Sequence, residues 1–190
     1  TLTPSQTKAA QQRLQLPKRF VLNVGTIEER KNAILAVKAL PSLPDDIHLV
    51  IVGRRTKYTT RVEKTAQQLG VSHRLHIMSG IGDDDLQAIS QLAETFVYPS
   101  RYEGFGIPII EAIQSGLPVV ACTGSCLEEA GGPDCLYASP DDDAAFANAI
   151  NQTLIGAEGR KQRIERSREY VKRFENNDTA LQVAKIYSKL

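Results

Sequence analysis

Glu103 and Glu111 stand on either side of Gly104 and Gly106, in the segment from 98 to 118. Glycines let a ligand approach the backbone closely, and carboxylates accept strong hydrogen bonds from hydroxyl groups. The free N–H groups at the start of the helix expected next can receive phosphate oxygens. The segment therefore predicts a site for a phosphorylated sugar, with Glu103 facing sugar hydroxyls and Glu111 taking both hydroxyls of a ribose.

The helix that must position Glu111 has clear signals at both ends. Pro108 suits a first helical turn, and Gly116 followed by Pro118 ends the pattern. The sequence predicts a helix over 107–115, with Glu111 in an early turn. Its buried face is formed by residues at helical spacing: Ile109, Ile110 and Ile113.

The segment from 20 to 32 holds a second candidate, a loop that faces phosphate. An apolar strand ends at Gly25, and Arg30 and Lys31 follow where a helix is expected over 31–40. Positive charge at the start of a helix is electrostatically unfavourable, which favours a ligand-binding role for the two cations. The alternative is a solvated helix start.

Together the two segments resemble the signature of the family 4 (group 1) glycosyltransferases, which have a GT-B fold. In that family, two glutamates also stand eight positions apart. The first contacts the transferred sugar near the reacting carbon, and the second holds the nucleotide ribose. The resemblance implies these roles for Glu103 and Glu111, and a donor contact for Gly104, Phe105 and Gly106.

The resemblance also implies how the donor diphosphate is neutralised. Lys31 aligns with a lysine of the family's phosphate loop, whereas Thr26 stands where many members have arginine. We expect Arg30 to supply the missing cation, so that Arg30, Lys31 and Glu103 form the catalytic group. The turn after the first strand and the loop that packs against the nucleotide base add four donor-binding positions: Gly25, Thr26, Gly80 and Gly82.

The reaction implied is the retaining transfer of a hexose from a nucleoside diphosphate sugar to a glycan or lipid-linked acceptor, without metal or cofactor. The pattern GTxxxRKN from 25 to 32 resembles mannosyltransferases and favours GDP-mannose, with a UDP-sugar as the alternative. Two other classes stay open. One is a non-catalytic nucleotide-binding regulatory module, and the other is a different GT-B enzyme, such as a sugar-nucleotide epimerase or a phosphorylase.

Competing motifs carry less weight. The acidic run 83–85 imitates metal-binding aspartates, but Asp83 is better interpreted as a helix N-cap followed by acids in the first turn, so we predict no metal site. The chain lacks the GxxxxGK[ST] pattern and the third glycine of a dinucleotide fingerprint. We assign no role to the three histidines: His48, His73 and His76.

Composition is typical of a globular protein with one core. The 190 residues are 42% hydrophobic and 24% charged, and the net charge of +1 predicts no nucleic-acid partner. Three cysteines suggest reduced thiols. The chain shows no membrane-spanning run and no signal-peptide pattern. We therefore expect a cytoplasmic protein, with peripheral association at the inner face of the membrane as the alternative for the full-length protein.

Apolar runs alternate with helical patterns and predict a Rossmann-like parallel sheet with helices on both faces, one half of a GT-B architecture. Gly25, Gly53, Gly80 and Ser100 follow predicted strands, so we expect them at one crevice. The strands are expected near 20–25, 47–53, 74–78, 95–98 and 118–122, and the helices near 31–40, 58–69, 83–91, 107–115, 142–154, 158–174 and 178–190.

The resemblance divides the chain in two. Residues 1–19 would be a linker and short helix from an N-terminal domain that binds the acceptor, and 20–190 would be the donor-binding domain. A fragment of this kind is expected to bind donor but to transfer nothing without the acceptor domain.

Overall fold

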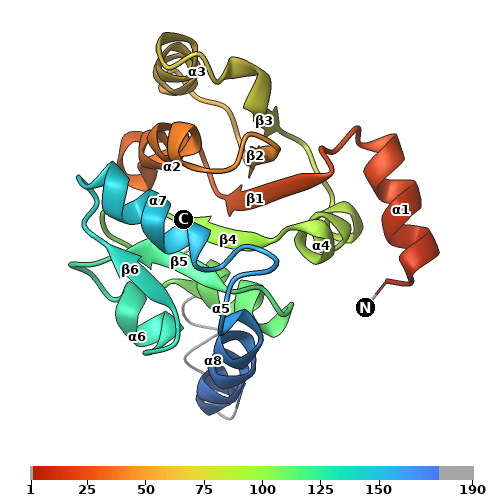
Figure 1. Ribbon diagram of the computed structural model, residues 1–190, viewed down its shortest axis with the longest axis vertical. Helices are drawn as coiled ribbons and strands as arrows, with labels where there is room; N and C mark the ends of the chain where they lie inside the picture. Colours follow the sequence, from red (N-terminus) through yellow and green to blue (C-terminus); the bar gives the residue numbers. More distant parts are fainter. Residues whose placement is uncertain (1, 176–190) are drawn as a thin grey trace.

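The computed structural model describes residues 2–175, and the helix expected over 178–190 lies outside this part of the chain. Six parallel strands form one sheet in the order β3-β2-β1-β4-β5-β6, as expected for a Rossmann-like fold (Figure 1). The strands are β1 (Arg19–Val24), β2 (Ile47–Val52), β3 (Leu75–Met78), β4 (Thr95–Tyr98), β5 (Val119–Cys122) and β6 (Leu136–Ala138).

Helices cover both faces of the sheet, and each face has its own apolar core (Figure 1). One core lies under α2 (Ala33–Ala39), α3 (Thr59–Gln68) and α7 (Asp143–Asn151). The other lies under α4 (Asp83–Leu92), α5 (Ile107–Gln114), α6 (Leu127–Gly131) and α8 (Arg160–Glu175), while α1 (Pro4–Arg13) packs against α4. None of the helices within residues 2–175 is long and apolar enough to cross a membrane.

The strand order reverses between β1 and β4, and this reversal defines where ligands bind in open sheets of this kind. The backbone ladder between the two strands covers only Val21 and Leu22 of β1. Beyond it, the buried side-chain amide of Asn23 donates to the Val97 carbonyl over 2.9 Å. The carboxyl ends of β1 and β4 are thereby held together up to the loops that follow them.

Two glycines meet where β1 and β2 end, as expected from their positions after strands. Gly25 N–H donates to the Val52 carbonyl over 3.0 Å, and Gly53 N–H donates to the Met78 carbonyl over 2.9 Å. A Cβ atom on Gly53 would lie 1.8 Å from the Gly25 carbonyl oxygen. Only glycine fits at residue 53, because the turn after β1 passes directly over it.

Local structure departs from expectation after β1. The predicted helix over 31–40 is wrong at its start, because Arg30 and Lys31 lie in a 3-10 turn, η1 (Glu29–Lys31), and Asn32 has the left-handed conformation with φ 54°. The helix α2 begins only afterwards, and a second 3-10 turn, η2 (Leu40–Ser42), follows it. The cations therefore precede a helix rather than occupying its first turn.

Three shorter elements were not predicted: β6, α6 and the 3-10 turn η3 (Ser72–Arg74). Each spans three to five residues, too few to show a hydrophobic period. The cap of α4 was also predicted wrongly. Gly82 is its N-cap, and Asp83 is the first helical residue.

A histidine pair on β2 and β3 generates a prediction about stability. His48 Nδ1 lies 2.8 Å from His76 Nε2, and burial lowers the pKa of both imidazoles, with the charges of His76 and Arg74 adding to the effect on His48. The unfolded chain therefore binds more protons than the folded chain below the ordinary histidine pKa of about 6.5.

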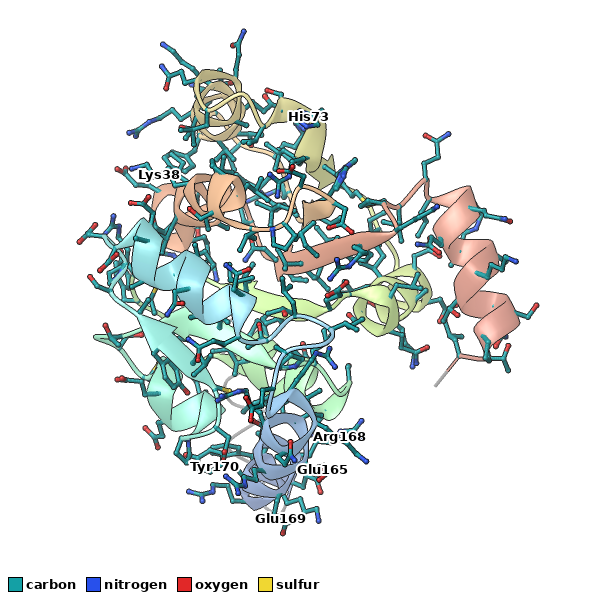
Figure 2. All side chains as sticks on the ribbon, viewed as in Figure 1. Lys38, His73, Glu165, Arg168, Glu169 and Tyr170 are labelled. Carbon is teal, nitrogen blue, oxygen red and sulfur yellow. The ribbon has the colours of Figure 1, made fainter. Side chains whose placement is uncertain are left out.

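We expect the free energy of unfolding to fall as the pH is lowered from about 7 to about 5, across the ordinary histidine pKa. Denaturant titrations should show a smaller loss in a His48→Asn/His76→Asn variant. His73, an exposed imidazole beside β3 (Figure 2), provides the matched control His73→Asn, which should keep most of the loss, because its charge lowers the pKa of His48 less than burial does. An equal loss in all three proteins would contradict this role of the pair.

Candidate functional site

The centre of the candidate site is an ion cluster between the loops that follow β1 and β4. Lys31 Nζ lies 2.5 Å from Glu103 Oε1, and Arg30 Nη1 lies 3.2 Å from Glu103 Oε2. The Glu103 side chain is only 11% exposed and that of Lys31 15%. The second guanidinium nitrogen of Arg30 contacts Glu28 Oε1 over 2.9 Å. The structure thus brings together the three residues that were predicted to be catalytic.

Backbone and amide hydrogen bonds join these loops. Arg101 N–H donates to the Arg30 carbonyl over 2.9 Å. The buried Asn32 side chain donates to the carbonyls of Pro99 and Pro140, over 3.2 and 3.0 Å. Because the left-handed conformation of Asn32 directs its amide toward both loops, the 3-10 turn before it is fixed against the ends of β4 and β6.

Gly25 and Thr26 lie at the end of β1, and the Lys31 side chain extends over the first of them. A Cβ atom on Gly25 would lie 3.8 Å from Lys31 Cε and 4.0 Å from Lys31 Nζ. Gly25 also has a positive φ of 149°, which side chains rarely adopt. Glycine therefore suits this turn. Because it has no side chain, the Lys31 side chain lies directly over the Gly25 backbone.

The electrostatics of the cluster follow from these contacts. Burial alone would raise the pKa of Glu103, but the hydrogen bond from Lys31 and its positive charge outweigh burial and hold the pKa below the ordinary value. Burial alone would lower the pKa of Arg30, but the charges of Glu103 and Glu28 raise it. Glu103 is therefore ionised at neutral pH and compensated by two cations.

Glu111 and the glycines lie at the start of α5. Gly106 is the N-cap with φ 97°, and a Cβ atom there would lie 3.1 Å from Ala130 Cβ of α6. Gly104 has no atom within 4 Å of a Cβ position, so its surroundings are open to a ligand. Glu111 lies on the exposed side of α5, in the turn after Pro108. Gly106 is therefore constrained by packing against α6, whereas the space around Gly104 is open.

The remaining predicted residues lie around this centre. The Phe105 ring packs edge-on against Phe174 of α8, with 5.4 Å between ring centroids. A nucleotide sugar that contacted Phe105 would therefore contact its backbone. Gly80 and Gly82 lie in the loop between β3 and α4, and Gly80 has φ 71°. Cys126, beside α6, donates a hydrogen bond from Sγ to the Glu103 carbonyl over 3.1 Å.

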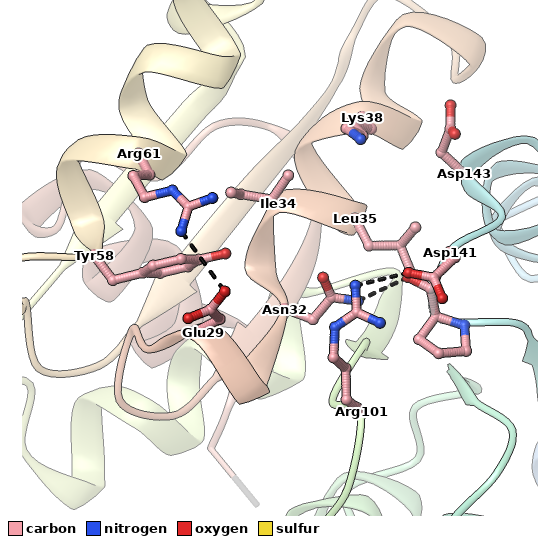
Figure 3. Close-up of a pocket in the computed structure, with 11 residues that line it drawn as sticks. Glu29, Asn32, Ile34, Leu35, Lys38, Tyr58, Arg61, Arg101, Asp141 and Asp143 are labelled. Carbon is pink, nitrogen blue, oxygen red and sulfur yellow. Dashed lines mark hydrogen bonds and ion pairs between the residues drawn. The ribbon is translucent and has the colours of Figure 1, made fainter.

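A cavity of about 210 Å³ borders the segment that carries the two cations (Figure 3). Ion pairs lie across it: Arg101 to Asp141 over 2.8 Å, and Arg61 to Glu29 over 3.7 Å. Sequence reasoning did not predict this cavity, because its charged residues are dispersed along the chain. Its lining residues do not include Glu103 or Lys31, so the candidate site remains at the ion cluster. The lining is Glu29, Asn32, Ile34, Leu35, Lys38, Tyr58, Arg61, Arg101, Pro140, Asp141 and Asp143.

Within the described residues, no group of three His, Cys, Asp or Glu side chains is placed to hold a metal ion. In the acidic run 83–85, Asp85 pairs with Arg13 of α1. The two cations of the ion cluster, Lys31 and Arg30, are themselves paired with carboxylates.

Comparison with known proteins identifies the family of this chain. The model of the family described as glycosyl transferases group 1 matches residues 4–170. O-antigen chain mannosyltransferase B of Escherichia coli is 30% identical over 193 residues, which cover 99% of this chain and 51% of that protein. MMP alpha-(1->4)-mannosyltransferase of Mycolicibacterium hassiacum is 34% identical over 131 residues, which cover 67% of this chain and 32% of that protein.

Solved structures agree on the fold. Alr3699/HepE of Anabaena, in complex with UDP and glucose, superposes with a TM-score of 0.84 at 21% identity, covering 100% of this chain and 53% of that one. Sucrose-phosphate synthase of Thermosynechococcus elongatus superposes with a TM-score of 0.79 at 29% identity, covering 96% of this chain and 48% of that one. The chain therefore spans about half the length of several proteins it matches.

The position of Asn32 generates a prediction about stability. Asn32→Ala removes the donor for two carbonyls and puts alanine in a left-handed conformation that asparagine tolerates better, so we expect a loss of about 1–3 kcal/mol in the free energy of unfolding. Asn151→Ala is the matched control, because that amide donates to the Ser42 carbonyl over 3.0 Å at an exposed position. Denaturant titration should show the larger loss for Asn32→Ala; equal losses would mean that Asn32 does not hold the two loops.

Proposed function

The chain belongs to group 1 of the glycosyl transferases, and from that premise we propose that it is the donor-binding half of a retaining enzyme. The reaction is the transfer of a hexose from a nucleoside diphosphate sugar. The observation that carries this proposal is the ion cluster of Lys31, Arg30 and Glu103 at the reversal of strand order. Residues 20–190 form the donor-binding domain. Residues 1–19 would link it to a second domain, which binds the acceptor.

The donor diphosphate takes the place of Glu103 as the partner of both cations. Two phosphates match Lys31 and Arg30 in number and are opposite to them in charge, and the N–H groups that begin α5 after Gly106 add donors without net charge. When the bond between sugar and phosphate breaks, negative charge grows on the leaving diphosphate. Fixed cations stabilise that charge more than they stabilise the bound donor, and this difference lowers the barrier.

The two glutamates divide the remainder of the donor between them. Glu111, exposed on α5, accepts hydrogen bonds from the ribose hydroxyls. Glu103, once released from its cations, accepts hydrogen bonds from the transferred sugar, and the open surroundings of Gly104 leave space for the ring. Gly80 and Gly82 border the nucleotide base.

The relatives favour a particular donor class. Two of them are named mannosyltransferases, which supports mannose and hence GDP-mannose. The structure of Alr3699/HepE contains UDP and glucose, which keeps a UDP-sugar as the second candidate. We propose a glycan or lipid-linked acceptor, bound through the N-terminal domain.

Lys31 provides the first test of this function. Lys31→Ala should weaken the binding of GDP or UDP by about 1.5–3 kcal/mol, the typical contribution of a hydrogen bond to a charged group. Isothermal titration calorimetry in the presence of a chelator measures this loss. Lys38→Ala is the matched control, because Lys38 is exposed on α2 and makes no contact with Glu103.

Two results would contradict the proposed diphosphate site. One is equal affinity for Lys31→Ala and Lys38→Ala. The other is binding by the unmodified chain that is absent with chelator and appears only when Mn²⁺ is added.

The cluster also predicts an unusual effect of neutralising Glu103. Glu103→Gln keeps the shape of the side chain but removes the negative charge that competes for Lys31, so free GDP or UDP should bind more tightly. The corresponding nucleotide sugar should gain less, because the amide is a poorer acceptor for sugar hydroxyls. Glu111→Gln should weaken both ligands alike. If Glu103→Gln changed the two affinities by the same factor, Glu103 would have no role toward the sugar.

A further inference from the structure

Tyr98 lies directly beneath the candidate site, although no sequence motif marked it. It is the last residue of β4 and is 1% exposed, and its ring stacks on that of Phe96 with 5.7 Å between centroids. Its hydroxyl accepts a hydrogen bond from Lys31 Nζ over 3.0 Å, and the same nitrogen lies 5.3 Å from the ring centroid. The one polar side-chain atom of this buried tyrosine therefore contacts the ammonium group of Lys31.

Lys31 is held from three sides. Its stem lies over Gly25, and its ammonium group contacts both Glu103 and the Tyr98 hydroxyl. Fixing a lysine side chain costs rotamer freedom, and these contacts offset that cost before any ligand binds. When a diphosphate replaces Glu103, the contact with Tyr98 stays in place. The ammonium group is then already oriented toward the phosphate before it arrives.

We propose that Tyr98 is a positioning residue for diphosphate binding, acting through Lys31 rather than by touching the ligand. The inference rests on the proposed function. A hydroxyl suits this task better than a carboxylate, because it accepts a hydrogen bond without adding negative charge that would repel the phosphates. Burial raises the pKa of Tyr98, and the charge of Glu103 adds to the effect, so the hydroxyl stays neutral.

Tyr98→Phe isolates this role, because phenylalanine keeps the buried ring and removes only the hydroxyl. We expect the Kd for GDP or UDP to rise about threefold to tenfold, the range for one lost hydrogen bond. In a Lys31→Ala background, the same substitution should cause no further change. Tyr137→Phe is the matched control: the Tyr137 hydroxyl donates to the Gly132 carbonyl over 2.8 Å on β6, and its removal should leave the Kd unchanged.

Each outcome of these Kd measurements either supports or contradicts the positioning role of Tyr98. An unchanged Kd in Tyr98→Phe overturns the inference. So does an equal rise in Kd in the native and Lys31→Ala backgrounds, because a purely structural effect would not depend on the lysine. If the unmodified chain bound neither GDP nor UDP, the proposed function would fail, and this inference with it; that result is distinct because it needs no variant.

Discussion

The candidate site depends on the compensation of one nearly buried carboxylate. Glu103 belongs to the loop after β4, whereas its partners Lys31 and Arg30 belong to the turn after β1. A charge in such a place costs several kcal/mol unless it is paired, so the two loops are stable only when they meet. Gly53 lets the turn after β1 pass closely, and Asn32 ties it to the ends of β4 and β6.

Under the proposed function, this pairing gives the site two states that differ in which anion the cations hold. With no ligand, Glu103 neutralises them, and the loops stay together. With a diphosphate bound, the phosphates would take over that role, and Glu103 would be released toward the sugar. The same charges would then serve both folding and binding, and Tyr98 would keep Lys31 in place during the exchange because its hydroxyl carries no charge.

Sequence reasoning predicted the parallel sheet because apolar runs mark β1, β2 and β5. The eight-residue spacing of Glu103 and Glu111 carried the family resemblance, which the match to the group 1 family confirms. Sequence reasoning failed for β6 and α6, which are too short to show a period, and for the start of α2. There, Asn32 bonds to carbonyls 67 and 108 residues away, and these distant contacts override local helix propensity. Tyr98 was missed because a buried aromatic in a strand looks like core.

The most direct measurement of the central claim follows Glu103 itself. Carbon-13 labelling of the glutamate carboxyl groups, with Glu103 assigned by comparison with Glu103→Gln, allows its titration to be followed by NMR with and without saturating GDP or UDP. Exchange of anions predicts a pKa below the ordinary value in the free chain and a clear rise when the diphosphate is bound, because Lys31 and Arg30 then compensate the phosphates. A nucleotide that binds and leaves the pKa of Glu103 unchanged would contradict the claim that diphosphate and carboxylate share these cations.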